Sequence, residues 1–475
     1  MTRRFDAPMP TETERPERRS RPRTAIIVGG GIAGIACALR LAEHGVRVTL
    51  LETRRKLGGR ATSFVDPRSG EWIDNCQHVV MGCCTNYLDL CRRLGVAERL
   101  EWHDEIYWVE AGGRMSLMKP GSLPAPAHFA GSLMRARFLG ARDKQAITEC
   151  MFDMLRCDRA EYSGITMGEW LRARNQTQGA IEKFWSPVIV SACNLGVDRV
   201  AASVAIHVFQ EGFLASRGSA RMGVSRVPLL HLYDQAEDSI RRTGGELRLG
   251  CGVERLDAGG VVTTAGERVE AEAVVCAVPG ERARRMVDEA TIRCDARFSA
   301  LDSMEHSPIV GVHLVFDRPV LGVHSAVLVG RETQWVFRKD REGTRVHAVI
   351  SAADELARRE ESDIVARVLS DLRACFRGAR DARLTSFRAV KEKLATFAAT
   401  PRFEAVRPAT TGASGIHLAG DYVRTGWPAT MEGAARSGYM AAAAVLRLEE
   451  KALLKPGLPC GRLARAVMSG RYSKE

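Results

Sequence analysis

The stretch TAIIVGGGIAGIACALRLAEHG, residues 24–45, determines how the chain begins to fold. An apolar, β-branched run at 24–28 meets a G-x-G-x-x-G turn, and a run rich in alanine and leucine follows. Gly45 is a natural helix end, and VRVTLLE at 46–52 predicts a second buried strand. This order of strand, glycine turn, helix and strand is typical of a unit that binds a dinucleotide.

Each position of the turn has a physical role in binding phosphate. Gly29 permits the tight turn, Gly31 lets the backbone approach a pyrophosphate, and Gly34 lets the helix pack closely on the strand. Ala33 lies in the same turn, where free N–H groups and the positive end of the helix dipole face the phosphates. Glu52, at the end of the second strand, is expected to accept hydrogen bonds from ribose hydroxyls.

The segment ETRRKLGGR at 52–60 resembles the extended signature of the flavin amine oxidase and carotenoid desaturase superfamily. The resemblance implies FAD as the cofactor, with the loop of Gly58 and Gly59 along its pyrophosphate. Arg60 can then neutralise phosphate charge.

Two later segments extend this resemblance. A strand from Val253, a hairpin, and AVVCAVP at 273–279 are similar to the strands that return to the nucleotide domain, where Val253 gives backbone contacts to the adenine. AGDYVRTGWPATMEG at 419–433 is similar to the motif in which the aspartate after Gly420, here Asp421, bonds a ribityl hydroxyl. Pro428 is expected to open a helix whose N-terminus, near Thr430 and Met431, faces the N1 and O2 edge of the flavin.

The fold class that follows is α/β combined with α+β. A Rossmann-like FAD-binding domain of the amine oxidase (GR2) type is interrupted by a discontinuous substrate-binding domain. We expect a disordered tail at 1–23, the FAD-binding domain at 24–113, 228–296 and 405–448, the substrate-binding domain at 114–227 and 297–404, and a basic C-terminal tail at 449–475. No cysteine lies between Cys375 and Cys460, so we expect FAD to be bound noncovalently.

The segment IDNCQHVVMG at 73–82 resembles the D-N-x-Q-H motif of the hydroxysqualene dehydroxylases, the squalene-associated FAD-dependent desaturases. AGDYVRTGWPATMEG and QWVF at 334–337 are similar to the same group, although Cys76 stands where many relatives have glycine. The resemblance implies that reduced flavin converts hydroxysqualene to squalene, which supplies hopanoids or sterols. His78 is the candidate general acid, with Gln77 beside it; the alternative is that both residues only orient the cofactor.

Three neighbouring polar residues are expected to have structural roles. Asp74 and Asn75 suit turn or cap hydrogen bonds. Glu432 suits the first turn of a helix, where a carboxylate complements the dipole, although a place near the flavin is the alternative.

Composition excludes several other classes of protein. No stretch reaches the roughly 18 consecutive apolar residues of a membrane-spanning helix, and the polar N-terminus lacks the apolar core of a signal peptide. The net charge is +12, but the arginines are scattered, so no nucleic-acid partner is expected. The 13 cysteines include no C-x-x-C pair, and no metal site is expected; the seven-residue steps from Cys76 to Cys83 and from Cys84 to Cys91 suggest one helix face instead.

A long-chain isoprenoid such as hydroxysqualene or squalene is held by burial alone, so an apolar substrate domain is expected. The enzyme should then be cytoplasmic and peripheral, at the inner face of the cell membrane, next to other enzymes of squalene synthesis. Apolar residues beside cations at Met115–Ile147, with Phe138 as an anchor, and at Leu453–Lys474 suit an anionic membrane surface. The alternative is that the first segment is buried core and the second a loose tail.

Three other functions fit the same motifs. An oxidative carotenoid or squalene desaturase needs the same cofactor and an apolar tunnel. A flavin amine oxidase needs an aromatic and acidic cage around an amine, which the low aromatic content of 6% makes less favourable. A noncatalytic flavin-bound lipid carrier would also keep the binding motifs.

Overall fold

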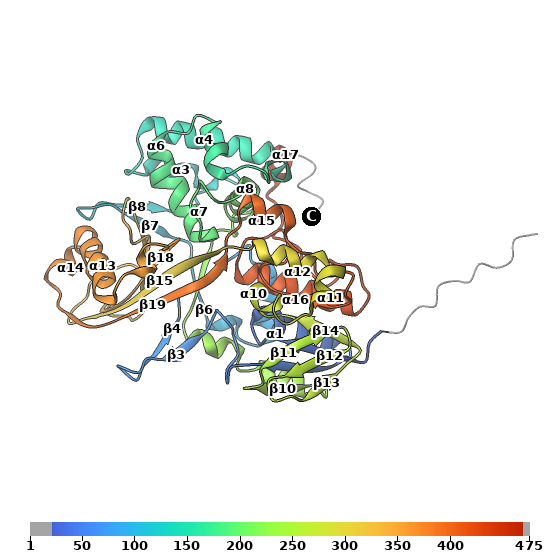
Figure 1. The fold of residues 1–475 in the computed structure, drawn as a ribbon. Coiled ribbons are helices and arrows are strands. Elements are labelled where there is room, and N and C mark those ends of the chain that lie inside the picture. The colour runs from blue at the N-terminus through green and yellow to red at the C-terminus, as the bar shows by residue number, and fades with distance from the viewer. Residues whose placement is uncertain (1–20, 469–475) are drawn as a thin grey trace, which may run out of the picture.

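The computed structural model describes residues 21–468, which form a nucleotide-binding part, a large mixed sheet and a helical part (Figure 1). The tail expected at 1–23 falls almost entirely outside these residues, as does the end of the chain after Met468. Within residues 21–468, no helix combines the length and the apolar composition that crossing a membrane requires.

The nucleotide-binding part contains a parallel sheet whose strands come from distant segments of the chain. Its order is β10-β2-β1-β14-β20, with bounds Glu246–Leu249, Arg47–Glu52, Thr24–Val28, Ala273–Cys276 and His417–Leu418. The chain alternates between strands and helices here, and parallel strands require such crossovers. The strand, helix and strand predicted from residues 24–52 are therefore confirmed, with the helix α1 at Ile32–Glu43.

Helix α1 is nearly all buried because α16 (Met431–Val445) packs along it. The close approach depends on Gly438, where an added Cβ would lie 2.3 Å from the carbonyl oxygen of Ala33. Beside the sheet, β11 (Val253–Asp257), β12 (Gly260–Thr263) and β13 (Arg268–Glu270) form the hairpin that the sequence predicts and a third strand.

The large mixed sheet has seven strands in the order β19-β15-β18-β17-β16-β7-β8. Their bounds are Leu384–Phe397, His306–Phe316, Arg345–Ser351, Trp335–Arg338, Ser325–Leu328, Ile106–Val109 and Met115–Met118. One face packs on α13 (Glu361–Cys375) and α14 (Arg377–Asp381), on the left of Figure 1. The sheet crosses the domain boundary expected at residue 113, because β7 pairs in parallel with β16.

Other elements also cross the expected boundaries. Strand β9 (Met222–Ser225) pairs with both β5 (Val79–Met81) and β6 (Leu100–His103), so residues 222–225 pack with the first segment. The boundaries at 296 and 404 cut through α12 (Ala296–Ala300) and α15 (Pro401–Val406). The strands β3 (Ser63–Val65) and β4 (Trp72–Asp74) form a separate two-stranded antiparallel sheet.

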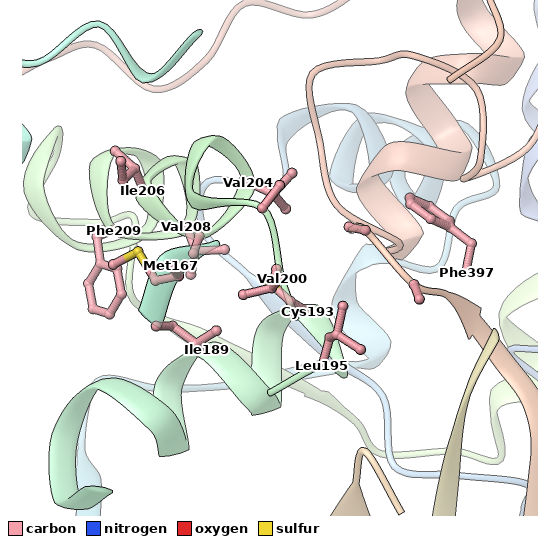
Figure 2. Close-up of a cluster of buried hydrophobic side chains, with 14 of the residues drawn as sticks. Met167, Ile189, Cys193, Leu195, Val200, Val204, Ile206, Val208, Phe209 and Phe397 are labelled. Carbon is pink, nitrogen blue, oxygen red and sulfur yellow. The ribbon is translucent and has the colours of Figure 1, made fainter. Parts of the chain in front are cut away.

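The helical part is built on a core of branched and aromatic side chains. Figure 2 shows Ile189 and Cys193 of α7 pointing toward residues of α8, including Val204 and Val208. The helices of this part are α3 (Ala130–Arg135), α4 (Ala141–Arg156), α5 (Met167–Arg172), α6 (Gln178–Ala180), α7 (Ser186–Cys193) and α8 (Ala202–Phe209). The remaining helices of the chain are α2 (Thr85–Arg93), α9 (Ala236–Arg241), α10 (Gly280–Ala283), α11 (Glu289–Cys294) and α17 (Arg462–Val467).

Three local expectations are wrong. The expected basic C-terminal tail at 449–475 is, as far as Met468, part of the packed structure, because α17 lies beside α4 and Ala464 and Met468 are buried in the core; the alternative of a loose tail is excluded for these residues. Phe138 is no surface anchor, because it is 3% exposed and stacks on Trp108. The cysteine steps do not mark one helix face: of that group only Cys91 is helical, since α2 begins after Cys84.

Candidate functional site

The glycine turn between β1 and α1 has the geometry that its sequence predicts. Gly29 adopts a φ of 110°, which side chains rarely adopt. A Cβ on Gly34 would lie 1.9 Å from the carbonyl oxygen of Gly29, so only glycine lets α1 begin here. Gly45, with a φ of 80°, ends α1 after the cap residue His44.

The N-terminus of α1 is suited to an anion. Gly31 is the N-cap residue, no side chain caps the helix, and the first turn, which includes Ala33, contains no acid. Helix N-terminal N–H groups that lack a capping side chain bind phosphate oxygens well. Gly58 donates its N–H to the carbonyl of Gly30 at 2.9 Å, which brings the second glycine loop against the turn.

The two glycine loops face each other through the Cα atoms of Gly31 and Gly59, with no side chain at either position. A Cβ on Gly59 would lie 3.1 Å from the Cα of Gly31, whereas a Cβ on Gly31 would meet no atom closer than 3.9 Å. This cradle has the shape and the donors that a pyrophosphate needs.

Glu52 lies at the end of β2, next to the glycine turn. Its carboxylate accepts hydrogen bonds from the N–H groups of Gly30 (2.7 Å) and Arg54 (2.8 Å). Its backbone carbonyl accepts from the N–H of Cys251 at 2.9 Å, two residues before Val253. Glu52 and Val253, which are distant in sequence, therefore lie at the same end of the parallel sheet.

Arg60 joins the glycine loop to two other segments. Its guanidinium donates to the carboxylate of Asp421 at 2.5 Å and to the carbonyl of Ala395 at 3.1 Å. Asn75 donates its side-chain amide to the carbonyl of Arg60, and Asp74 accepts from Ser63 at 2.7 Å. Asp74 and Asn75 therefore have the structural role that the sequence suggests, because they hold the Gly-Gly-Arg loop in place.

The N-terminus of α16 forms the other side of the site. Thr430 is the N-cap residue, and its hydroxyl accepts from the N–H of Gly433 at 3.1 Å. The helix begins at Met431, so the expectation that Pro428 opens it is wrong: Pro428 lies before the cap, in the turn after Gly420 and Asp421.

Glu432 has a larger structural role than the sequence suggests. It is fully buried, and its carboxylate accepts from the N–H of Tyr87 at 2.7 Å and from the side-chain amide of Asn86 at 2.8 Å. It thus caps α2 as well as lying in the first turn of α16. Burial raises its pKa, and the hydrogen bonds oppose this shift.

A cavity of about 620 Å³ extends from the N-terminus of α16 into the helical part. Its wall is overwhelmingly apolar, and two single-turn π-helices, Ile181–Trp185 and Gln210–Leu214, contribute Phe184 and Phe213. Such π-turns occur often at functional sites. The large sheet contributes one side of the wall, made of Ile309, Val327, Trp335, Phe337 and Val349.

The most exposed apolar side chains that line the cavity mark its mouth. They are Met134 of α3, Phe152 of α4 and Leu463 of α17, with exposed fractions of 62%, 53% and 45%. No local pattern in the sequence predicts that α17 belongs to this site, since the helix is short and lies about 300 residues from α4 along the chain.

The two candidate catalytic residues face different surroundings. Gln77 lines the cavity, and its side-chain oxygen accepts a hydrogen bond from the ammonium of Lys339 at 3.0 Å. His78 does not line the cavity; its Nδ1 lies 3.1 Å from the carbonyl oxygen of Cys76. Burial lowers the pKa of His78 from its usual value of 6.5, so the imidazole is neutral at pH 7. The position and the lowered pKa of His78 suit a hydrogen-bonding residue better than a general acid.

Within the described residues, no cluster of three or more histidine, cysteine or acidic side chains has metal-binding geometry. The cradle, the carboxylate of Glu52 and the N-terminus of α16 together fit a dinucleotide that carries a ring system toward the cavity.

Comparison with known proteins identifies this dinucleotide site. Residues 32–446 match the family described as flavin containing amine oxidoreductase. The chain is similar to a 15-cis-phytoene desaturase of Synechococcus elongatus, at 23% identity over 90% of this chain and 96% of the relative. It is also similar to a hydroxysqualene dehydroxylase of Rhodopseudomonas palustris, at 27% identity over 89% of this chain and 98% of the relative.

Solved structures share the fold at lower identity. A putrescine oxidase bound to putrescine superposes with a TM-score of 0.66 at 16% identity, over 90% of this chain and 99% of that structure. A cyclohexylamine oxidase of Brevibacterium oxydans gives a TM-score of 0.64 at 18% identity, over the same shares of the two chains. Because the family model spans most of the sequence, the chain belongs to the flavin containing amine oxidoreductase family and is an FAD-dependent oxidoreductase.

Proposed function

We propose that this enzyme removes the hydroxyl group of hydroxysqualene reductively and releases squalene. The observation that carries the proposal is the apolar cavity of about 620 Å³ between the flavin side of α16 and the mouth at α3, α4 and α17. A chain of isoprene units has no charge to bind, so its affinity must come from buried apolar area, at about 25 cal/mol per Å². The cavity offers this area and excludes water from the reacting end.

Two kinds of relative support an isoprenoid substrate. One relative is named hydroxysqualene dehydroxylase and several are named 15-cis-phytoene desaturase. The substrates in both names, hydroxysqualene and phytoene, are long isoprenoid chains. The D-N-x-Q-H resemblance at residues 74–78 favours the dehydroxylase.

The reaction consumes a hydride and a proton: the allylic C–O bond breaks, water leaves, and a C–H bond forms. Bound FAD in its reduced form supplies the hydride. In this chain the glycine loops and Arg60 would contact the pyrophosphate of FAD. Asp421 would contact the ribityl chain, and Thr430 would lie at the flavin edge. The apolar wall keeps water from intercepting a cationic carbon.

The oxidative desaturase is the second candidate, because the phytoene desaturases match the chain over a similar length. It would use the same cavity, but oxidised flavin would take a hydride from the chain, a proton would leave the adjacent carbon, and a double bond would form. A flavin amine oxidase is less favoured, because the cavity wall carries few polar groups that could hold an amine.

We also propose that the enzyme works as a peripheral protein at the inner face of the cell membrane. The exposed apolar residues at the mouth stand beside the exposed cations Arg135, Arg156, Arg462 and Arg465, none of which forms an ion pair within residues 21–468. Apolar side chains among cations suit an anionic bilayer, at about 1 kcal/mol for each cation near its surface. The substrate would then pass from lipid into the cavity, with other enzymes of squalene synthesis supplying it.

The test is an anaerobic single turnover. Chemically reduced enzyme should reoxidise on addition of hydroxysqualene, with squalene in the lipid extract in equal amount. Oxidised enzyme that introduces double bonds into phytoene or squalene would establish the desaturase instead. Turnover of amines would establish an amine oxidase, and lipid binding without any turnover would indicate a carrier.

A further inference from the structure

The wall of the apolar cavity includes the imidazole side chain of His207. This residue lies in the last turn of α8, is 3% exposed and lines the cavity. Directly after α8, the backbone changes to the single-turn π-helix Gln210–Leu214. Such π-turns occur often at functional sites. The fold therefore places one imidazole in a wall that is overwhelmingly apolar.

His207 lies at the end of the cavity that is nearest to α16. Its ring meets the indole of Trp427 edge to face, with ring centroids 4.7 Å apart and an angle of 76° between the planes. Trp427 also lines the cavity, and Thr430, three residues later, is the N-cap of α16. A substrate group beside His207 would therefore lie at the end where the flavin is expected, away from the mouth at Met134 and Leu463.

Neither ring nitrogen of His207 has a hydrogen-bond partner among residues 21–468. Among the buried side-chain nitrogen and oxygen atoms of the described wall residues, the indole N–H of Trp108 is the other one without a partner. An indole only donates, whereas a neutral imidazole has one N–H donor and one acceptor nitrogen. Buried polar groups without partners destabilise the protein, so a ligand that pairs with them binds more tightly.

Three other polar side chains of the wall already have partners within the protein. The side-chain oxygen of Gln77 accepts from Lys339 at 3.0 Å. The hydroxyl of Ser191 accepts from the indole N–H of Trp335 at 2.6 Å, and the hydroxyl of Thr430 caps α16. His207 therefore differs from these residues in having both a donor and an acceptor to offer.

The imidazole of His207 is neutral at pH 7. Burial is the main cause that lowers its pKa well below 6.5, and the cations Arg159, Arg436 and Arg407 lower it further. A neutral ring can bond an alcohol without placing a positive charge beside a carbon that becomes cationic. Both nitrogens are enclosed by protein atoms, but the torsion about Cβ–Cγ is soft in histidine, so rotation of the ring turns a nitrogen toward the cavity.

We propose that His207 binds the hydroxyl oxygen of the substrate and thereby places the carbon that carries it at the flavin end of the cavity. The inference rests on the proposed function, because hydroxysqualene carries an oxygen and the hydrocarbons squalene and phytoene do not. A site with a buried hydrogen-bonding group discriminates against an analogue that leaves this group unpaired. His207 thus selects the alcohol, and the loss of its hydrogen bond after the C–O bond breaks favours release of squalene.

The test compares the binding of hydroxysqualene and squalene to the oxidised holoenzyme, which has no hydride to transfer. Both lipids are added in the same detergent, and quenching of tryptophan fluorescence reports binding, since Trp108, Trp335 and Trp427 line the cavity. Wild type should bind hydroxysqualene about tenfold more tightly than squalene. His207→Leu, of similar volume, should lose this preference through weaker binding of hydroxysqualene alone. His207→Gln, which keeps a donor and an acceptor, should retain a preference of about threefold or more.

The matched control is His128→Leu. His128 is also buried with both ring nitrogens unpartnered among the described residues, but it does not line the cavity, so its replacement should leave the preference unchanged. Partly misfolded protein weakens the binding of both lipids equally, so the ratio of the two affinities is independent of folding yield. If His207→Leu does not retain FAD, His207→Phe is the second apolar variant.

The outcomes separate this inference from the proposed function. A wild-type enzyme without a preference, or an apolar His207 variant whose preference stays within about twofold of wild type, overturns the role of His207. This result can occur even when reduced enzyme converts hydroxysqualene to squalene, in which case the proposed function stands alone. If no squalene forms, the proposed function fails, and a preference for the alcohol that depends on His207 still supports the oxygen-binding role.

Discussion

The cofactor cradle and the apolar cavity meet at the N-terminus of α16, but they are built in opposite ways. The cradle is made of backbone atoms and has no room for a side chain at its glycines. Gly29, Gly34 and Gly59 each have a neighbouring atom within about 3 Å of the position that a Cβ would occupy. The cavity is made of side-chain bulk from eight or more separate elements, and no one residue defines it. A motif at fixed spacing encodes the first, and packing among distant segments creates the second.

This contrast predicts very different sensitivity to single substitutions. One added methyl group should disable the cradle, whereas the cavity should tolerate apolar exchanges of similar volume.

The largest effect is expected for Gly34→Ala. The new Cβ would meet the carbonyl oxygen of Gly29 at 1.9 Å, and backbone cannot move aside as a side chain can. We expect a loss of about 3 kcal/mol or more in the free energy of unfolding and purified protein with little FAD. Urea unfolding and flavin absorbance measure both. Gly164→Ala, where no atom lies within 4 Å, is the control and should change little. Wild-type FAD content in Gly34→Ala would show that the backbone at Gly29 can move enough to accommodate the added methyl group.

An intermediate effect is expected for Asp421→Asn, which removes charge without changing shape. If Asp421 accepts a hydrogen bond from the ribityl chain, FAD affinity should fall by about 1.5–3 kcal/mol, measured by titrating the apoprotein. Asp302→Asn removes an exposed carboxylate and serves as the control. An unchanged dissociation constant for FAD would show that Asp421 does not contribute to FAD binding. The FAD should also separate from acid-denatured protein; flavin that stays with the chain would contradict noncovalent binding.

How far the sequence predicts the site follows from the same contrast. The positions of Gly29 to Gly34, Glu52 and the Thr430 cap follow from local spacing, because a strand, turn and helix fix them within a few residues. The approach of Arg60 to Asp421 follows only from family resemblance. The packing of α17 beside α4 depends on tertiary contacts and has no local signal in the sequence.

Phe138 illustrates why sequence alone does not predict which side chains of an amphipathic segment are exposed. An amphipathic segment has one apolar face, and its sequence does not say whether that face meets a core or a lipid. In the fold, Phe138 stacks on Trp108, whereas Met134 of the same segment is 62% exposed.

The smallest effect is expected at the mouth of the cavity. Met134→Asp combined with Leu463→Asp should weaken binding to liposomes with anionic lipid by about 1–2 kcal/mol per side chain, measured by sedimentation at low salt. Leu249→Asp, on the edge strand β10 at the other end of the molecule in Figure 1, should leave binding unchanged. Wild-type protein that stays in the supernatant would exclude the membrane proposal.

The parallel sheet around the cofactor also sets an order of events during protein synthesis. Strand β1 leaves the ribosome well before its neighbour β14, which follows some 250 residues later, and β20 and α16 emerge later still. Until α16 arrives, the apolar surface of α1 is uncovered and half of the flavin site does not exist. Such long-range pairing makes folding slow and exposes intermediates to aggregation. A ribosome that stalls before residue 431 therefore yields a chain that lacks α16 and the part of the flavin site that this helix forms.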